Sequence, residues 1–338
     1  MKKFLAILMA ALMMISMFAV AGAEDVKTYK VGVAIYQYTD NFMTLYRNEI
    51  EAYFKTLETD TVKYELTFAD GKNDMAEQTN QIRNFITQGM NVIILNLVQT
   101  SSADAVIDEI VEAGIPLVLI NREPLAYDAD GNTIDEAYEG ILNNPTVCYV
   151  GADARQSGTF QGKMVADLPN HGDINGDGVI SYIMIEGDPE NIDAQYRTEF
   201  SVKALTDAGY EVKCLDDQVG NWDQTKGQEL CANALTSFGY DIEVVFCNND
   251  AMALGAATAI TTAGRVVGED IYLLGVDALE EAVQLVREGE MTGTVLNDHI
   301  GQSHAAVDVA VKLLNGEAIE NYYWVDYVMV NQEYVNAQ

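Results

Sequence analysis

Short apolar runs alternate with amphipathic segments along most of this chain. The runs are rich in β-branched residues and lie at 31–36, 92–98, 116–120, 180–185, 243–247, 271–276 and 292–296. Between them apolar residues recur at helical spacing, which predicts helices over 43–57, 75–89, 102–114, 194–209, 280–289 and 303–316. Continuous apolar strands separated by amphipathic helices are typical of parallel sheets that helices cover on both faces.

This alternation occurs twice, once before residue 121 and again between 180 and 297. Each stretch is long enough for one doubly wound domain. The pattern therefore predicts an α/β protein with two doubly wound, Rossmann-like parallel-sheet domains side by side.

Carboxylate and carboxamide side chains follow five of the predicted strands, at the edge where ligands bind in such sheets. They are Asp40, Asn41, Asn96, Asn248, Asn249, Asp250, Asp277, Asn297 and Asp298. Asp and Asn also serve there as turn formers and helix N-caps, which accounts for part of the set. The remainder suits a neutral polyol, because these groups bond hydroxyls without requiring a charged ligand. Phe42 and Trp222 would supply the apolar faces.

Composition and glycine patterns exclude several other ligands. The chain has 52 acidic and 19 basic residues and a net charge of −33, which argues against nucleic acid and anionic lipid as partners. Three histidines leave little for a His-rich metal centre. Neither glycine-rich stretch, 151–158 or 254–264, has the spacing of a phosphate loop.

Residues 1–23 have the form of an export signal. Lys2 and Lys3 precede an apolar stretch that ends before the small-residue site at 21–23. The apolar stretch approaches the length of a membrane anchor, but the acidic residues directly after Ala23 favour cleavage there. We expect an exported, periplasmic protein that is not embedded in a membrane, since no later segment is apolar enough to span one.

The four cysteines form no close pair in the sequence. Cys148, Cys214 and Cys247 lie in strand-like runs and Cys231 in a helix-like one. Disulfides are permitted in an exported protein, yet buried free thiols are an equally good interpretation, because a large domain needs no such staple. We take these cysteines to be structural.

Residues 173–181 read DINGDGVIS, which is the beginning of a calcium-binding loop. Asp173, Asn175 and Asp177 occupy the first ligand positions, and Gly178 the sharp turn. Position 12 is Met184 instead of the usual Glu, so the closing carboxylate must come from elsewhere in the chain. The alternative is a solvated Asp/Asn/Gly turn; we expect a structural Ca²⁺ ion.

Taken together, these segments resemble one known family. The matching blocks are GVAIYQYTDNFM (32–43), INREP (120–124), GADARQSG (151–158), DINGDGVI (173–180), IDAQYRT (192–198), EVVFCNNDAMALGA (243–256), GVDAL (275–279) and GTVLND (293–298). In this order they resemble the periplasmic D-galactose/D-glucose-binding proteins of sugar ABC transport and chemotaxis, within the ribose/galactose-type periplasmic binding proteins. The resemblance covers essentially the whole chain after residue 23.

The resemblance implies a set of sugar-binding residues. Phe42 and Trp222 match the two aromatic residues that sandwich the pyranose ring. The polar residues that match hydrogen-bonding positions are Asp40, Asn96, Asp193, Arg197, Asn249, Asp277 and Asn297. Asn191 replaces a histidine that is common in the family, which puts the preference at the sugar's 6-position in doubt.

The resemblance also implies the calcium ligands. They are Asp173, Asn175, Asp177, the carbonyl of Val179, Ser181 and Glu243. Glu243 would supply the distant carboxylate that the loop lacks. Ser181 stands where the family commonly has glutamine, and its shorter side chain would leave that ligand to water or weaken binding.

The implied architecture is the type I periplasmic binding protein fold, with two lobes joined by a three-segment hinge. The resemblance places 24–120 and 298–323 in the N-terminal lobe, and 121–297 and 324–338 in the C-terminal lobe with the calcium loop. D-galactose or D-glucose would bind between the lobes, and hinge closure would bury it. An ABC transporter permease, and also a chemoreceptor, would then read the closed form of a monomer.

Three other functions remain to be weighed. A binding protein for another monosaccharide, such as ribose or xylose, or for an autoinducer would share the same plan. A glycoside-cleaving enzyme would also place carboxylates near a sugar, but the Asp, Asn and Arg set resembles saturation of hydroxyls more than an acid and nucleophile pair. A transcriptional regulator would need a basic helix-turn-helix segment, which the sequence lacks. We therefore expect a binding protein and no enzymatic activity.

Overall fold

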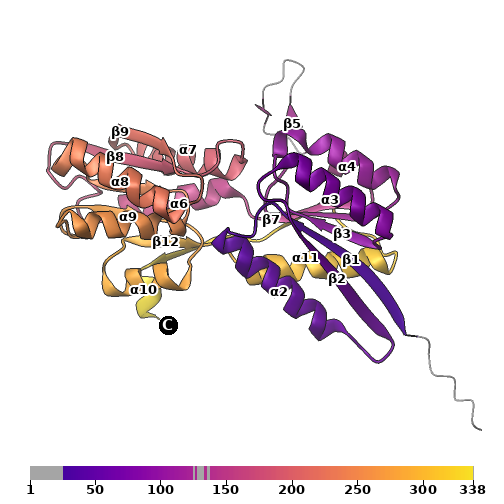
Figure 1. The fold of residues 1–338 in the computed structure, drawn as a ribbon. Helices are drawn as coiled ribbons and strands as arrows, with labels where there is room; N and C mark the ends of the chain where they lie inside the picture. Colours follow the sequence, from indigo (N-terminus) through magenta and orange to yellow (C-terminus); the bar gives the residue numbers. More distant parts are fainter. Residues whose placement is uncertain (1–25, 125, 128–132, 135–137, 338) are drawn as a thin grey trace, which may run out of the picture.

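The computed structural model describes residues 26–337, apart from 125, 128–132 and 135–137, and shows two α/β lobes side by side (Figure 1). In the described part of the chain each lobe contains one six-stranded sheet. The first sheet is parallel throughout, with the strand order β13 (Tyr322–Trp324), β7 (Val147–Gly151), β4 (Leu117–Ile120), β3 (Val92–Leu95), β1 (Lys27–Ile35), β2 (Val62–Asp70). A short hairpin, β5 (Ala126–Tyr127) and β6 (Thr133–Ile134), lies apart from it.

The second sheet has the same plan with one antiparallel edge. Its order is β14 (Val328–Asn331), β12 (Gly293–Leu296), β11 (Tyr272–Leu274), β10 (Val244–Cys247), β8 (Val179–Glu186), β9 (Glu211–Val219), and only β14 runs against its neighbour. The predicted pair of doubly wound α/β domains is therefore confirmed.

Helices cover both faces of each sheet. Those of the first lobe are α2 (Asn41–Leu57), η1 (Thr100–Ser102), α3 (Met75–Gln88), α4 (Ala103–Glu112), α5 (Glu139–Leu142) and α11 (His299–Leu314). Those of the second are α6 (Ala154–Ala166), α7 (Ile192–Asp207), α8 (Gln224–Phe238), η2 (Gly239–Asp241), α9 (Asp250–Thr262), α10 (Glu280–Glu288) and α12 (Gln332–Asn336). Each lobe has two apolar cores, one on either face of its sheet.

The predicted lobe boundary after residue 120 is wrong. Strand β7 pairs in parallel with β4 in the first sheet, so the chain remains in the first lobe until Gly151. Strand β13 pairs with β7 and extends the first lobe through Trp324. The apolar run at 116–120 identifies a strand but not its sheet neighbours, which long-range pairing decides. The chain therefore crosses between the lobes at 152–153, 297–298 and 325–327, which gives the expected three segments.

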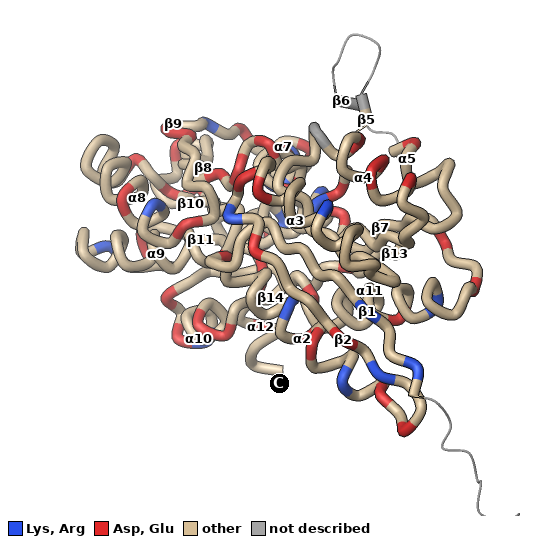
Figure 2. Tube along the Cα trace, turned by 45° about the vertical axis from the view of Figure 1, so that its right-hand side comes forward, with Lys and Arg blue, Asp and Glu red and all other residues tan. Residues whose placement is uncertain are grey.

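The export signal and its cleavage after Ala23 lie outside the described residues, so both stay predictions. Within the described part, no helix is long and apolar enough to cross a membrane. All four cysteines are free: Cys148, Cys231 and Cys247 are buried, and Cys214 is exposed. Asp and Glu positions occur on both lobes, in keeping with the net charge of −33 (Figure 2).

Two glycines bring helices α6 and α7 into close contact. A Cβ atom on Gly158 would lie 2.9 Å from the carbonyl oxygens of Tyr196 and Arg197. One on Gly162 would overlap the carbonyl oxygen of Ser201. Only a residue without a side chain lets the two backbones approach this closely, and the contact fixes α7 against the sheet.

Candidate functional site

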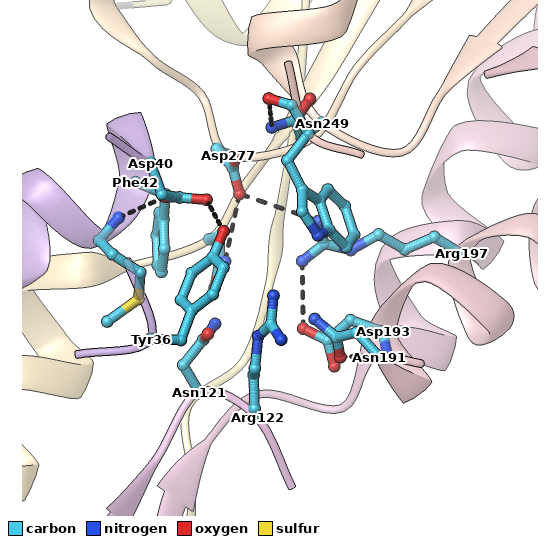
Figure 3. A pocket seen from close by; sticks show the side chains of 13 residues that line it. Tyr36, Asp40, Phe42, Asn121, Arg122, Asn191, Asp193, Arg197, Asn249 and Asp277 are labelled. Atoms are coloured by element: carbon cyan, nitrogen blue, oxygen red, sulfur yellow. Dashed lines mark hydrogen bonds and ion pairs between the residues drawn. The ribbon is translucent and has the colours of Figure 1, made fainter. Parts of the chain in front are cut away.

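A pocket lies between the lobes, next to the carboxyl ends of strands from both sheets (Figure 3). The space that no atom fills, including the solvent at its mouth, is about 320 Å³. It is lined by Tyr36, Asp40, Phe42, Met43, Asn121, Arg122, Asn191, Asp193, Arg197, Trp222, Asn249, Asp277 and Asn297. Nine of the ten residues predicted to bind sugar are among them.

Asp40 forms part of the first lobe's wall and also begins helix α2. One carboxylate oxygen accepts the backbone N–H of Met43 at 2.7 Å, the usual bond of an N-cap. The other oxygen accepts the hydroxyl of Tyr36 at 2.7 Å. The carboxylate is thereby held against the pocket, two residues before the buried ring of Phe42.

Arg122 and Asn121 are pocket residues that were not predicted. The Arg122 guanidinium lies 3.7 Å from the centre of the Tyr36 ring and donates to the carbonyl of Val98 at 2.8 Å. It also lies 3.4 Å from the carboxylate of Asp188, which belongs to the other lobe. Its Nε is buried and has no hydrogen-bond partner among the described residues, so it is available to a ligand.

The signal for these residues was present in the sequence. Asn121 and Arg122 directly follow the predicted strand 116–120, which is the rule that located the other candidates. Tyr36 ends the predicted strand 31–36 and Met43 begins the predicted helix 43–57, and neither was singled out as a binding residue.

Helix α7 supplies the charged centre of the second lobe. Asn191 caps this helix by accepting the N–H of Asp193 at 3.0 Å. Arg197, one turn later, donates to the carbonyl of Asn248 at 2.8 Å and lies 3.5 Å from Asp193. Its Nε is buried without a partner in the described part of the chain. The helix thus presents a fixed cation with one donor directed to no protein group.

Asp277 faces Arg197 across the pocket at 4.0 Å and accepts a hydrogen bond from Asn297 at 3.2 Å. The segment between β11 and α10, which contains Asp277, is fixed by the buried carboxylate of Asp250. This carboxylate accepts the N–H of Leu279 at 2.8 Å and the hydroxyl of Thr294 at 2.6 Å. This hydrogen bonding fixes the loop although the backbone at Asp277 has φ 119°.

Left-handed backbone conformations gather at the pocket. Asn121, Trp222 and Asp277, all lining residues, have positive φ values of 60°, 65° and 119°. Such conformations are costly for residues other than glycine and persist where the surroundings enforce them, often at functional sites. The Trp222 indole lies directly on the backbone of Gly187, where a Cβ atom would overlap it.

Asn96 is the predicted sugar contact that does not line the pocket. It is fully buried and donates to the carbonyl of Ile120 at 3.2 Å and to the side chain of Asn121 at 3.1 Å. Its oxygen accepts the N–H of Tyr36 at 3.2 Å. Asn96 therefore positions two lining residues from behind the pocket wall.

Burial raises the pKa of two carboxyl groups in the pocket. The pKa of Asp193 rises to about 6 and that of Asp277 to about 7, with Arg197 opposing both shifts. Asp40 adds to the rise at Asp277. Both groups therefore change charge near neutral pH.

These shifts predict a pH-dependent stability of the ligand-free protein. From about pH 4 to 7 the folded state holds protons that the unfolded state has released, so the free energy of unfolding falls as pH rises. Asp277→Asn cannot titrate, and we expect a smaller fall between pH 5 and 7.5, measured by urea denaturation. Asp207→Asn on the exposed end of α7 is the control. Equal slopes in wild type and Asp277→Asn would contradict the prediction.

Backbone N–H groups of the loop at 173–181 are hydrogen-bonded to the side chain of Glu243, and calcium binding by these residues stays a prediction. One Glu243 oxygen accepts the N–H groups of Ile174 and Asn175 at 2.6 and 2.9 Å, and the other accepts that of Ser181 at 2.8 Å. Asp173 accepts the N–H groups of two loop glycines. The described residues contain no ready group of three or more His, Cys, Asp or Glu side chains that would hold a metal.

Comparison with known proteins gives the family. Residues 31–318 match the family described as periplasmic binding protein domain. The D-galactose/methyl-galactoside binding periplasmic protein MglB of Haemophilus influenzae is 33% identical over 90% of this chain and 87% of its own length. A putative rhizopine-binding protein of Rhizobium meliloti is 32% identical over 98% and 97%.

Solved structures agree. An ABC transporter solute binding protein from Bacillus halodurans with bound myo-inositol is 29% identical, covers 94% of this chain and 98% of its own, and superposes with a TM-score of 0.77. With its two lobes, three crossings and shared pocket, this chain belongs to the periplasmic binding protein family, has the type I fold, and is a solute-binding protein of ABC-transporter type, not an enzyme.

Proposed function

We propose that the protein captures a cyclic polyol, D-galactose or D-glucose, and delivers it to an ABC transporter permease and also to a chemoreceptor. The observation that carries the proposal is the pocket itself, which combines planar Asp and Asn groups, two arginines and three aromatic side chains. Hydroxyl groups are donors and acceptors at once, so such a set can satisfy each of them. Export through residues 1–23, with cleavage after Ala23, would bring the protein to the periplasm.

Binding by both lobes explains how the ligand would change the protein's shape. Asp40 and Phe42 belong to the first lobe, whereas Asp193, Arg197 and Trp222 belong to the second. An open hinge separates the two groups, so only the closed arrangement offers all of them to one sugar. The ligand then shifts the equilibrium towards closure by its greater affinity for that arrangement.

The ligand can be identified by calorimetric titration of protein that has been unfolded, dialysed and refolded to remove carried-over sugar. D-galactose, D-glucose, D-ribose and myo-inositol are titrated in turn. We expect submillimolar binding of galactose or glucose and weaker binding of ribose. Preferential binding of myo-inositol or ribose would assign another polyol to the pocket, and no heat with any of them would refute the proposal. Mutating Asn191→His would then test the preference at the 6-position.

We further propose that residues 173–181 bind a structural Ca²⁺ ion together with Glu243. The loop donors are oxygen atoms, which calcium prefers: Asp173, Asn175, Asp177, the Val179 carbonyl and Ser181. Glu243 is 1% exposed and no cation contacts it among the described residues, so a bound divalent ion would neutralise a buried carboxylate. When bound, the ion would tie the loop to the beginning of β10.

Chelation tests this site. We expect EGTA to lower the melting temperature by about 5 °C or more, since a ligand at 100 times its Kd stabilises by about 2.7 kcal/mol. Added Ca²⁺ should restore the melting temperature. Asp177→Ala is the matched variant, because its melting temperature should no longer respond to EGTA. A wild-type melting temperature that does not change with chelator would refute the site.

A further inference from the structure

Tyr327 contacts the charged centre of the pocket from outside it. Its hydroxyl accepts a hydrogen bond from Nη2 of Arg197 at 3.1 Å. The Arg197 guanidinium lies 6.0 Å from the Tyr327 ring and 5.7 Å from that of Trp222, which lines the pocket. Tyr327 itself does not line the pocket and is 4% exposed. Burial raises the pKa of Tyr327 to about 12, so the hydroxyl stays protonated at neutral pH.

Tyr327 belongs to the third crossing between the lobes, at 325–327, between β13 and β14. Its N–H donates to the side chain of Gln156 at 2.7 Å, and the amide of Gln156 donates to Asp326 at 3.4 Å. The N–H of Val325 donates to the carbonyl of Gly151 at 2.8 Å. These bonds tie the third crossing to the two residues that flank the first, Gly151 at the end of β7 and Gln156 in α6. A hinge rotation that changes the backbone there therefore also moves the Tyr327 hydroxyl.

The second crossing has a matching contact. Asn297, at 297–298, donates to the carboxylate of Asp277 at 3.2 Å, and Gln302 holds the Asn297 oxygen at 2.6 Å. Asp277 and Arg197 face each other at 4.0 Å. Two hinge segments thus each bond one member of the same charged pair, and only Asn297 lines the pocket.

We propose that Tyr327 is a positioning residue that couples the hinge to the ligand by fixing the Arg197 guanidinium. The proposal rests on the proposed function, in which this pocket binds a sugar. In the bonded arrangement Nη2 donates to the Tyr327 hydroxyl at 3.1 Å and makes only a longer bond of 3.5 Å to Asp193. Nη1 donates to the carbonyl of Asn248, and Nε has no partner among the described residues, which leaves it for a ligand oxygen. Without the hydroxyl, the guanidinium is free to turn towards Asp193 or Asp277, and its free donor is lost to the ligand.

Tyr327→Phe tests the coupling. A hydrogen bond to a charged group contributes about 1.5–3 kcal/mol, so we expect the Kd for D-galactose or D-glucose to rise about tenfold or more. With one spin label on each lobe, the sugar concentration at which half of the protein is closed should rise by the same factor. Tyr272→Phe is the control, because it removes a hydroxyl bonded to Asn170 at 3.0 Å in the same lobe, away from the pocket. A wild-type Kd for Tyr327→Phe would overturn the proposal.

A second measurement needs no sugar. The chain has two tryptophans, so Trp324→Phe leaves Trp222 as the single indole emitter. Because the Arg197 cation lies beside this indole, displacing it should shift the Trp222 emission in Tyr327→Phe but not in Tyr272→Phe. Unchanged emission would overturn the positioning role. The two failures can be told apart. If the wild-type protein binds none of the sugars but Tyr327→Phe still shifts the Trp222 emission, the proposed function is refuted, whereas the positioning of Arg197 by Tyr327 is supported.

Discussion

Replacing Arg197 by methionine should weaken sugar binding at least a hundredfold and lower the free energy of unfolding by about 3 kcal/mol at pH 7.5. Arg197 is the cation between Asp193 and Asp277, and all three side chains are buried. Without the guanidinium, two buried carboxylates remain without their cation, and the carbonyl of Asn248 loses its donor. Calorimetry and urea denaturation measure the two effects.

Lys203 provides the control on the same helix. It pairs with Asp207 at 2.8 Å, but both side chains are about half exposed, so Lys203→Met should change the stability by less than about 1 kcal/mol. The stability loss of Arg197→Met should also shrink at pH 5, because Asp193 and Asp277 are then protonated and need no cation. A loss that is equal at both pH values would show that charge is not its cause.

Gly187→Ala should raise the Kd for sugar about tenfold although it removes no group that contacts the ligand. The added Cβ would overlap the Trp222 indole, and crowding of this kind costs about 1–3 kcal/mol. The backbone of Gly187 does not need a glycine conformation, and its N–H is fixed by the side chain of Asn248 at 2.9 Å. The indole must therefore move away from the position in which it lines the pocket.

A double-mutant cycle separates this explanation from a general disturbance of the loop. If Gly187 acts only through the indole, Gly187→Ala should cost little further affinity in a Trp222→Ala background. If the affinity losses of Gly187→Ala and Trp222→Ala add in the double variant, the methyl group acts on a group other than the indole. Emission from Trp222 in the Trp324→Phe background would report the displaced ring directly.

The central strands could be predicted from the sequence because they are buried on both faces and read as unbroken apolar runs. The edge strand β2 could not, and β9 was identified only as a strand-like run around Cys214, since the residues of both strands alternate with polar ones and are mostly half-buried or exposed. Helix α9 was missed for the opposite reason: it is apolar on nearly all sides and has no amphipathic period. Membership of β7 in the first sheet depends on pairing with β4, for example of Val147 with Leu117, thirty residues earlier, which no local pattern encodes.

A position in the pocket lining could be predicted best where a residue both follows a strand and matches the family motif. Asn96 meets both criteria, yet its amide is used by Tyr36, Ile120 and Asn121, and this depends on how deeply the strand end is buried. Tyr327 follows a three-residue edge strand of half-exposed aromatic residues, and nothing in that pattern indicates that the chain returns to the other lobe there.

Three pocket residues also begin helices: Asp40 caps α2, Asn191 caps α7 and Asn249 caps α9. Exchanging such a cap for an apolar residue costs about 1 kcal/mol of stability. Evolution towards a new solute therefore loses stability wherever it places an apolar residue at one of these three positions. Larger changes in specificity should come from lining residues that cap no helix, such as Met43, Asn121 and Arg122, and it is there that relatives with different ligands should diverge first.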